Sequence, residues 1–261
     1  MVESVIPELD DGGGGWHRWL DRQVRRRPEL PYVAPFFAYL LLLAIDSLVD
    51  APVYQLPLYA LRTVVGLAVA IAFWKYYPPI GRLHPLKCLV IGLGVAYLWV
   101  MVHRLVAGQF VAGQWVRQPL DWYVQPFGAD ASPDEYFDPR AVYGSGVVYW
   151  LYLLVRIGGA SVTVPIIEEL FWRAFLLRAL VSWDDFEHVD LGTFTWRSFL
   201  ICSLLSALEH PQWEVGILCW MIYNALFCWT RSLLCLMVTH GVTNLALYTH
   251  VVLKDDWVFW S

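Results

Sequence analysis

The feature that most constrains this sequence is a series of apolar runs long enough to cross a lipid bilayer. A membrane-spanning helix needs about 20 mostly apolar residues. Candidate runs cover residues 32–49, 56–76, 86–106, 142–160, 162–181, 197–210, 215–230 and 232–253. The sequence therefore predicts an all-α, polytopic membrane helical bundle of about eight transmembrane helices.

The composition supports a membrane protein and argues against other classes. Hydrophobic residues make up 58% of the 261 residues and charged residues only 16%, whereas a soluble domain is about a quarter charged. The 15 Trp, 14 Tyr and 13 Phe residues provide the aromatic anchors that membrane interfaces favour. The net charge of −5 argues against a nucleic-acid partner, which would need a basic face.

The charge distribution predicts how the chain is divided and oriented. Residues 1–30 are expected to form an N-terminal tail with a glycine linker, and residues 31–261 a single membrane-embedded domain. The tail carries an arginine cluster, which the positive-inside rule places in the cytoplasm, in bacteria at the inner membrane. Its members are Arg18, Arg22, Arg25, Arg26 and Arg27. Eight crossings return the C-terminus to the same side, and the acidic, aromatic segment 107–140 is expected to be an external loop.

Polar side chains inside the later apolar runs mark the candidate functional site. An ionisable group within a membrane segment is costly, so it is a functional candidate by default. Three short motifs carry such groups, E-E-L-F-W-R, S-A-L-E-H-P and T-H-G-V-T-N. The candidate residues are Glu168, Glu169, Arg173, His210, His240 and Asn244.

The spacing within these motifs suggests different roles for the candidate residues. Adjacent helical residues point about 100° apart, so Glu168 and Glu169 cannot both face one reacting atom. Arg173 lies four residues after Glu169, a favourable spacing for an ion pair, which leaves Glu168 freer to act as a general base. His240 and Asn244 share one helix face and could offer two N–H donors to an oxyanion. A Glu–Arg pair that only holds helices together explains Glu169 and Arg173 equally well.

The order of these motifs resembles that of the type II CAAX prenyl endopeptidases, within the wider family of CAAX proteases and bacteriocin-processing enzymes (the CPBP or ABI family). The resemblance covers residues 140–250 and consists of E-E-x-x-x-R, a histidine at the end of a later helix, and H-x-x-x-N. The phrase E-E-L-F-W-R-A-F-L-L-R looks especially like bacterial members, including a subset associated with exosortase systems.

The resemblance implies an intramembrane endopeptidase that uses no cofactor. Glu168 and His210 would activate a water molecule, while His240 and Asn244 would stabilise the oxyanion. Glu169 and Arg173 would orient the site. The implied substrate is a membrane-associated protein or peptide tail in the lipid bilayer. One departure concerns substrate shape: the family usually has Phe four residues before the histidine, where this chain has Ser206.

Two other interpretations of the same residues stay open. Glu168, His210 and His240 could instead bind zinc as a two-histidine, one-carboxylate site, although the chain has no H-E-x-x-H motif. The polar cluster could also belong to a non-catalytic membrane immunity or scaffold protein, or to a proton relay. The predicted topology opens the site toward the cytoplasm, and the sequence carries no signal for an oligomeric state.

Overall fold

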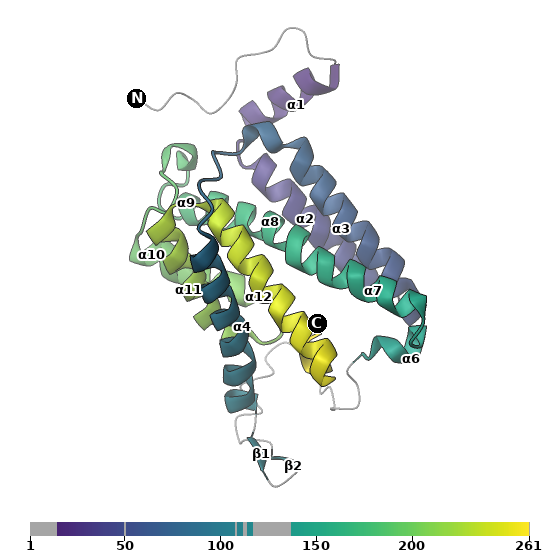
Figure 1. The fold of residues 1–261 in the computed structure, drawn as a ribbon. Helices are drawn as coiled ribbons and strands as arrows, with labels where there is room; N and C mark the ends of the chain where they lie inside the picture. The colour runs from purple at the N-terminus through teal and green to yellow at the C-terminus, as the bar shows by residue number, and fades with distance from the viewer. Residues whose placement is uncertain (1–14, 50, 108, 112–113, 117–136, 261) are drawn as a thin grey trace.

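The structure, a computed structural model, is a helical bundle in which the C-terminal helix packs between the fourth helix and the long helix at the centre of the chain. It describes residues 15–49, 51–107, 109–111, 114–116 and 137–260. The all-α prediction is confirmed for these residues, apart from one short antiparallel hairpin of β1 (Gln109–Val111) and β2 (Gln114–Val116). The hairpin projects beyond the end of the bundle (Figure 1). It lies in the expected external loop, of which residues 108, 112–113 and 117–136 lie outside the described residues.

In the first half of the chain, the residues that the structure describes form four helices. They are α1 (Gly15–Arg26), α2 (Leu30–Asp46), α3 (Gln55–Ala72) and α4 (Pro85–Ala107), with 3₁₀ turns at Pro52–Tyr54 and Trp74–Tyr76. The predicted N-terminal tail is helical from Gly15, and α1 is bent by 101° relative to α2. An ion pair of 2.7 Å between Asp21 and Lys75 ties α1 to the end of the α3 segment.

The centre of the chain contains one long, continuous helix where the sequence suggested two. After the short α6 (Pro139–Tyr143), helical structure runs without a break from Val147 to Ala179, a length of 33 residues. It consists of α7 (Val147–Gly158), a π-helical stretch (Gly159–Thr163), α8 (Val164–Glu169), a second π-helical stretch (Leu170–Leu176) and α9 (Leu177–Ala179). The prediction of separate spans at 142–160 and 162–181 is wrong, because π-helical turns absorb the irregularity around Pro165 without ending the helix.

The remaining helices are α10 (Trp196–Ala207), α11 (Trp213–Thr230) and α12 (Leu233–Lys254), with 3₁₀ turns at Phe186–His188 and Trp257–Phe259. Within the described residues, four helices are long and apolar enough to cross a membrane, or five if α1 and α2 count as one bent span. These four cover Pro52–Ala72, Pro85–Leu105, Val147–Ala179 and Leu233–Lys254. These long apolar helices identify the chain as an integral membrane protein. The predicted count of eight crossings loses its basis, because two of the predicted spans form the single helix Val147–Ala179.

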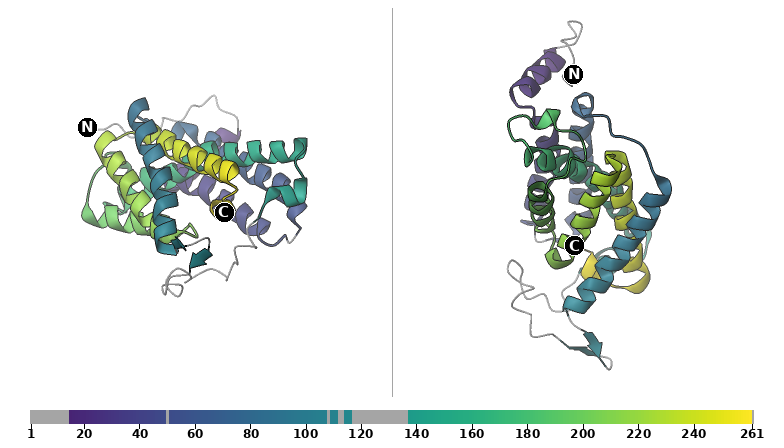
Figure 2. Two further views of the ribbon diagram at one scale, coloured as in Figure 1. Left: turned by 60° about the horizontal axis from the view of Figure 1, so that its bottom comes forward. Right: turned by 90° about the vertical axis from the view of Figure 1, so that its left-hand side faces the viewer.

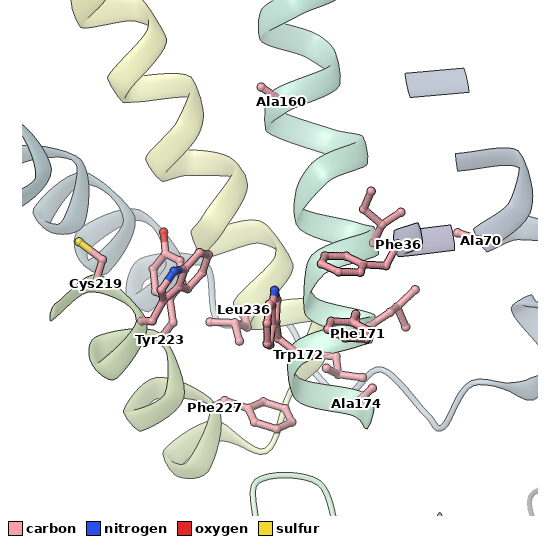
Figure 3. Close-up of a cluster of buried hydrophobic side chains, with 14 of the residues drawn as sticks. Phe36, Ala70, Ala160, Phe171, Trp172, Ala174, Cys219, Tyr223, Phe227 and Leu236 are labelled. Carbon is pink, nitrogen blue, oxygen red and sulfur yellow. The ribbon is translucent and has the colours of Figure 1, made fainter. Parts of the chain in front are cut away.

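Helix α12 connects the two sides of the bundle. It packs along α4 on one side and against the first π-helical stretch and α8 on the other, while α2 pairs with α3 and α10 with α11 (Figures 1 and 2). The buried side chains between these layers include Trp172 from the long helix, Tyr223 and Phe227 from α11, and Leu236 from α12 (Figure 3). On the α2 side, the rings of Phe36 and Phe171 stack at 4.1 Å.

Candidate active site

A cavity of about 320 Å³ in the middle of the bundle contains most of the predicted functional side chains. Four of the six line it: Glu168, His210, His240 and Asn244. They come from three separate parts of the chain, namely α8, the turn after α10, and α12. The fold therefore brings together residues up to 76 positions apart in the sequence, the separation between Glu168 and Asn244.

The two adjacent glutamates have different surroundings. Glu168 lines the cavity, and its Oε2 atom is buried without a hydrogen-bond partner among the described residues. The Glu169 side chain is completely buried and engaged on both oxygens. Its Oε2 lies 3.0 Å from Nη1 of Arg173, and its Oε1 lies 2.9 Å from Nδ1 of His240. The structure thus contains the expected Glu169–Arg173 pair and leaves Glu168 facing open space.

Arg173 is held by groups that the sequence interpretation did not include. Its Nε donates to Oδ1 of Asn224 at 3.1 Å, and its guanidinium lies 4.7 Å from the ring centre of Trp220. Asn224 in turn donates to the Ser203 hydroxyl at 2.9 Å. In the sequence, Asn224 is the one amide side chain within the apolar stretch of α11. Because a buried amide needs hydrogen-bond partners, this isolated amide was the signal that could have identified Asn224.

His210 sits between two indole rings at the wall of the cavity. Its ring centre lies 5.5 Å from those of Trp99 and Trp220, and its Nδ1 is buried without a hydrogen-bond partner among the described residues. The neighbouring Glu209 also lines the cavity, and its Oε2 accepts a hydrogen bond of 2.9 Å from Nε1 of Trp172. Glu209 is a third carboxyl group at the site that the predicted set omitted, although it adjoins His210.

The orientation of His240 is fixed by its contacts. Its ring packs at 5.3 Å against both Trp220 and Tyr223, and the Tyr223 hydroxyl is bonded to Thr243 at 2.6 Å. A carboxylate beside an arginine can only accept hydrogen bonds, so Nδ1 of His240 donates to Glu169. This arrangement leaves Nε2 as the ring nitrogen that can serve the cavity.

Asn244 has a structural partner that the sequence did not suggest. Its Nδ2 donates to the carbonyl of Ala160 at 2.8 Å. Pro165 has no N–H, so the carbonyls four and five residues before it, those of Ser161 and Ala160, lack their α- and π-helical donors. Asn244 supplies a donor to one of them. One N–H of this amide is therefore engaged, and the other is left for a ligand.

Gly241 lets α12 approach the same irregular turn. A Cβ atom at Gly241 would lie 2.5 Å from the Ser161 carbonyl oxygen, which no side chain tolerates without movement. The H-G-V-T-N motif therefore combines a glycine for close approach with an asparagine for hydrogen bonding. Together these residues hold His240 next to Glu169.

The position where the family usually has phenylalanine is buried in this protein. Ser206 is completely buried, and its hydroxyl donates to the carbonyl of Cys202, one turn earlier in α10. The side chain is thus used within the helix packing.

The residues proposed for the zinc alternative do not form a recognisable metal site. Across the part of the chain that the structure describes, no group of three or more His, Cys, Asp and Glu side chains converges as metal ligands would. Glu168, His210 and His240 line one cavity, but His240 already uses Nδ1 for Glu169. A chelator experiment decides this alternative directly.

Comparison with known proteins identifies one related family. Residues 149–246 match the family model described as type II CAAX prenyl endopeptidase Rce1-like. The matched segment includes α8, α10, α11 and most of α12, and with them all six predicted site residues. No curated protein and no solved structure matches the chain.

Proposed function

We propose that this protein is an intramembrane endopeptidase with a glutamate-activated water, because residues 149–246 match the model of the type II CAAX prenyl endopeptidase Rce1-like family, the family that the motifs resemble. In this proposal, Glu168 and His210 activate the water, and His240 and Asn244 stabilise the oxyanion. Glu169 and Arg173 are positioning residues. The assignment to an exosortase-associated bacterial subset stays a prediction.

The observation that carries the proposal is the contrast between the two glutamates. Glu169 is completely buried and lies 3.0 Å from Arg173 and 2.9 Å from His240, whereas Glu168 lines the cavity and takes part in no ion pair among the described residues. A general base needs an oxygen within reach of the reacting water, and this condition favours Glu168. His210, whose Nδ1 has no hydrogen-bond partner in the described part of the chain, is the second group suited to hold or transfer that proton.

The pairing of His240 with Glu169 supports its proposed role as a donor. The carboxylate at Nδ1 orients the ring and leaves Nε2 as the nitrogen available to the cavity, and the proposed donor role requires that Nε2 carries a proton. Nε2 of His240 and the second N–H of Asn244 can then donate to the negative oxygen of a tetrahedral intermediate. Glu169 forms an ion pair with Arg173 and a hydrogen bond with His240, and these two contacts hold the His240 ring in one orientation.

The proposed reaction is an ordinary peptide hydrolysis. Water attacks the carbonyl carbon of the peptide bond while Glu168 takes one of its protons. The C–N bond then breaks, and the proton is delivered to the departing amine. The products are a new carboxylate and a new amine, so no oxidant, reductant or covalent enzyme intermediate is needed.

The location of the cavity favours a membrane-associated substrate. Glu168 belongs to the long apolar helix of Val147–Ala179, which is itself a candidate membrane span. A peptide tail attached to the bilayer is concentrated at such a site, whereas a water-soluble protein is not. We therefore propose a membrane-associated protein or peptide tail as the substrate.

A peptide-cleavage assay tests the proposal. Purified protein in detergent is incubated with a quenched fluorescent peptide library, and wild type is compared with Glu168→Gln. Glu187→Gln, in the turn before α10 and outside the cavity lining, is the matched control. We expect cleavage by wild type and by the control, with a loss of about two or more orders of magnitude in Glu168→Gln. Equal cleavage by Glu168→Gln and wild type would contradict the mechanism.

A further inference from the structure

The cavity contains a second charged group that the proposed mechanism does not use. Arg156, on α7, lines the same cavity as Glu168. The described residues provide no acidic partner for its guanidinium. Its Nη2 donates a hydrogen bond of 2.8 Å to the backbone carbonyl of Trp260, a neutral acceptor that leaves the charge uncompensated.

Arg62 provides an informative comparison, because it lines the cavity too but is neutralised. Its Nη1 lies 2.7 Å from Oδ2 of Asp46, and the side chain is almost completely buried. Both arginines lie over the Tyr59 ring, Arg62 at 4.4 Å and Arg156 at 4.5 Å from its centre, and Arg156 also lies 5.6 Å from the ring centre of Tyr248, so the Asp46 carboxylate is what distinguishes them. Aromatic faces stabilise a cation only partly, so its positive charge is left for a ligand.

We propose that Arg156 forms an anion subsite within the active-site cavity and binds the C-terminal carboxylate of the peptide substrate. This inference rests on the proposed endopeptidase function. A guanidinium matches a carboxylate with two parallel N–H donors, and such a pair is strongest in an apolar surrounding. A peptide that enters an apolar cavity must also satisfy its terminal charge, and Arg156 offers the partner.

The position of Arg156 in the long helix gives its separation from Glu168 along the axis. Arg156 and Glu168 belong to the same continuous helix and are 12 residues apart. At 1.5 Å per residue this separation is about 18 Å along the axis. An extended peptide covers about 3.3 Å per residue, so this separation corresponds to roughly five peptide residues.

Two peptides of one sequence, ending in a free carboxylate or in a carboxamide, test the subsite. Their kcat/KM values are measured with wild type, Arg156→Gln and Arg156→Lys in neutral detergent. Arg178→Gln is the matched control, because Arg178 is a buried arginine of the same long helix that also lies over aromatic rings but not at the cavity. The ratio of acid to amide is compared within each variant, so a partly unfolded preparation does not affect it.

We expect wild type and Arg178→Gln to prefer the acid by about tenfold or more, on the order expected for a charged hydrogen bond. Arg156→Gln should lose this preference, and Arg156→Lys should keep part of it. A wild type that treats acid and amide alike, or an Arg156→Gln variant that still prefers the acid, would overturn the subsite.

A binding measurement separates failure of the subsite from failure of the proposed function. Anisotropy of the labelled acid and amide peptides is recorded with the Glu168→Gln protein, which requires no turnover. Tighter binding of the acid, lost when Arg156→Gln is introduced as well, supports the subsite even if the cleavage mechanism is wrong. Equal binding of both peptides overturns the subsite even if cleavage depends on Glu168.

The second source of an anion, a lipid headgroup, is tested by adding phosphatidylglycerol or phosphatidylcholine to the detergent. If Arg156 binds the substrate carboxylate, wild type should still prefer the acid peptide over the amide peptide in the presence of either lipid. Arg156-dependent thermal stabilisation by phosphatidylglycerol alone, with no acid preference in its absence, would assign the subsite to a lipid phosphate and overturn the substrate assignment.

Discussion

Nδ1 of His240 donates a hydrogen bond of 2.9 Å to Oε1 of Glu169, joining the first and last motifs of the candidate site. The other oxygen of Glu169 lies 3.0 Å from Arg173, so one carboxylate orders both an arginine and a histidine. Glu168, one residue earlier, takes part in neither contact and instead lines the cavity. These surroundings suit Glu169 to a structural role and Glu168 to a chemical one.

The first prediction separates these two roles by stability. Glu169→Gln should lower the free energy of unfolding by about 3 to 5 kcal/mol, because it breaks a buried ion pair and leaves Arg173 uncompensated. Glu168→Gln should not lower stability, since the described residues provide no hydrogen bond to its Oε2. Thermal unfolding in detergent measures both. A Glu168→Gln protein less stable than Glu169→Gln would contradict the assignment.

The second prediction concerns the close contact between α12 and the long helix. Gly241→Ala places a Cβ atom 2.5 Å from the Ser161 carbonyl and should cost about 1 to 3 kcal/mol of stability. Gly94→Ala, in α4, is the control, because its Cβ would meet nothing within 4 Å. The control should be neutral or slightly stabilising, as alanine favours a helix. Equal effects of the two substitutions would show that the contact is unimportant.

The third prediction tests the partner of Arg173. Asn224→Ala removes the acceptor for Arg173 Nε and should destabilise the protein by about 1 to 3 kcal/mol. Ser203→Ala removes only the hydrogen bond between Asn224 and Ser203, which does not involve Arg173, and should lower the stability by less. Thermal unfolding compares the two. If Ser203→Ala proves the more damaging substitution, Asn224 does not hold Arg173 as described.

The fourth prediction addresses the zinc alternative. Cleavage by the purified protein should be unchanged after prolonged treatment with a metal chelator, because the proposed mechanism activates the attacking water with Glu168 and His210. Rates before and after chelation, and after zinc is added back, measure this. Loss of cleavage that zinc restores would establish a metal-dependent reaction in place of the proposed one.

Local spacing predicted part of the site from the sequence. Glu169 and Arg173 are four residues apart in one helix, so their ion pair follows from helical geometry alone. The contact between Glu169 and His240 was not predicted, because 71 residues separate them and helix packing decides which side chains meet. For the same reason, Asn224 acquired a place near the site only in the folded chain.

The sequence predicted the fold class, an all-α membrane bundle, better than it predicted where each membrane-spanning helix begins and ends. Apolar runs are a strong signal for membrane helices, and the helical bundle follows from them. The division near residue 161 failed because Pro165 suggests a helix boundary, whereas Asn244 and the close approach of Gly241 compensate for its missing N–H. These compensating residues lie on another helix and are not visible in the local sequence.

The most direct test of the central claim is a double-mutant cycle on Glu168 and His210, measured as kcat/KM for peptide cleavage. If both side chains activate one water molecule, removing either disables the same step, and their effects do not add. We predict that the Glu168→Gln, His210→Gln double variant cleaves about as slowly as the slower single variant. A double variant whose loss equals the product of the two single losses would show independent roles and contradict the shared activation of one water.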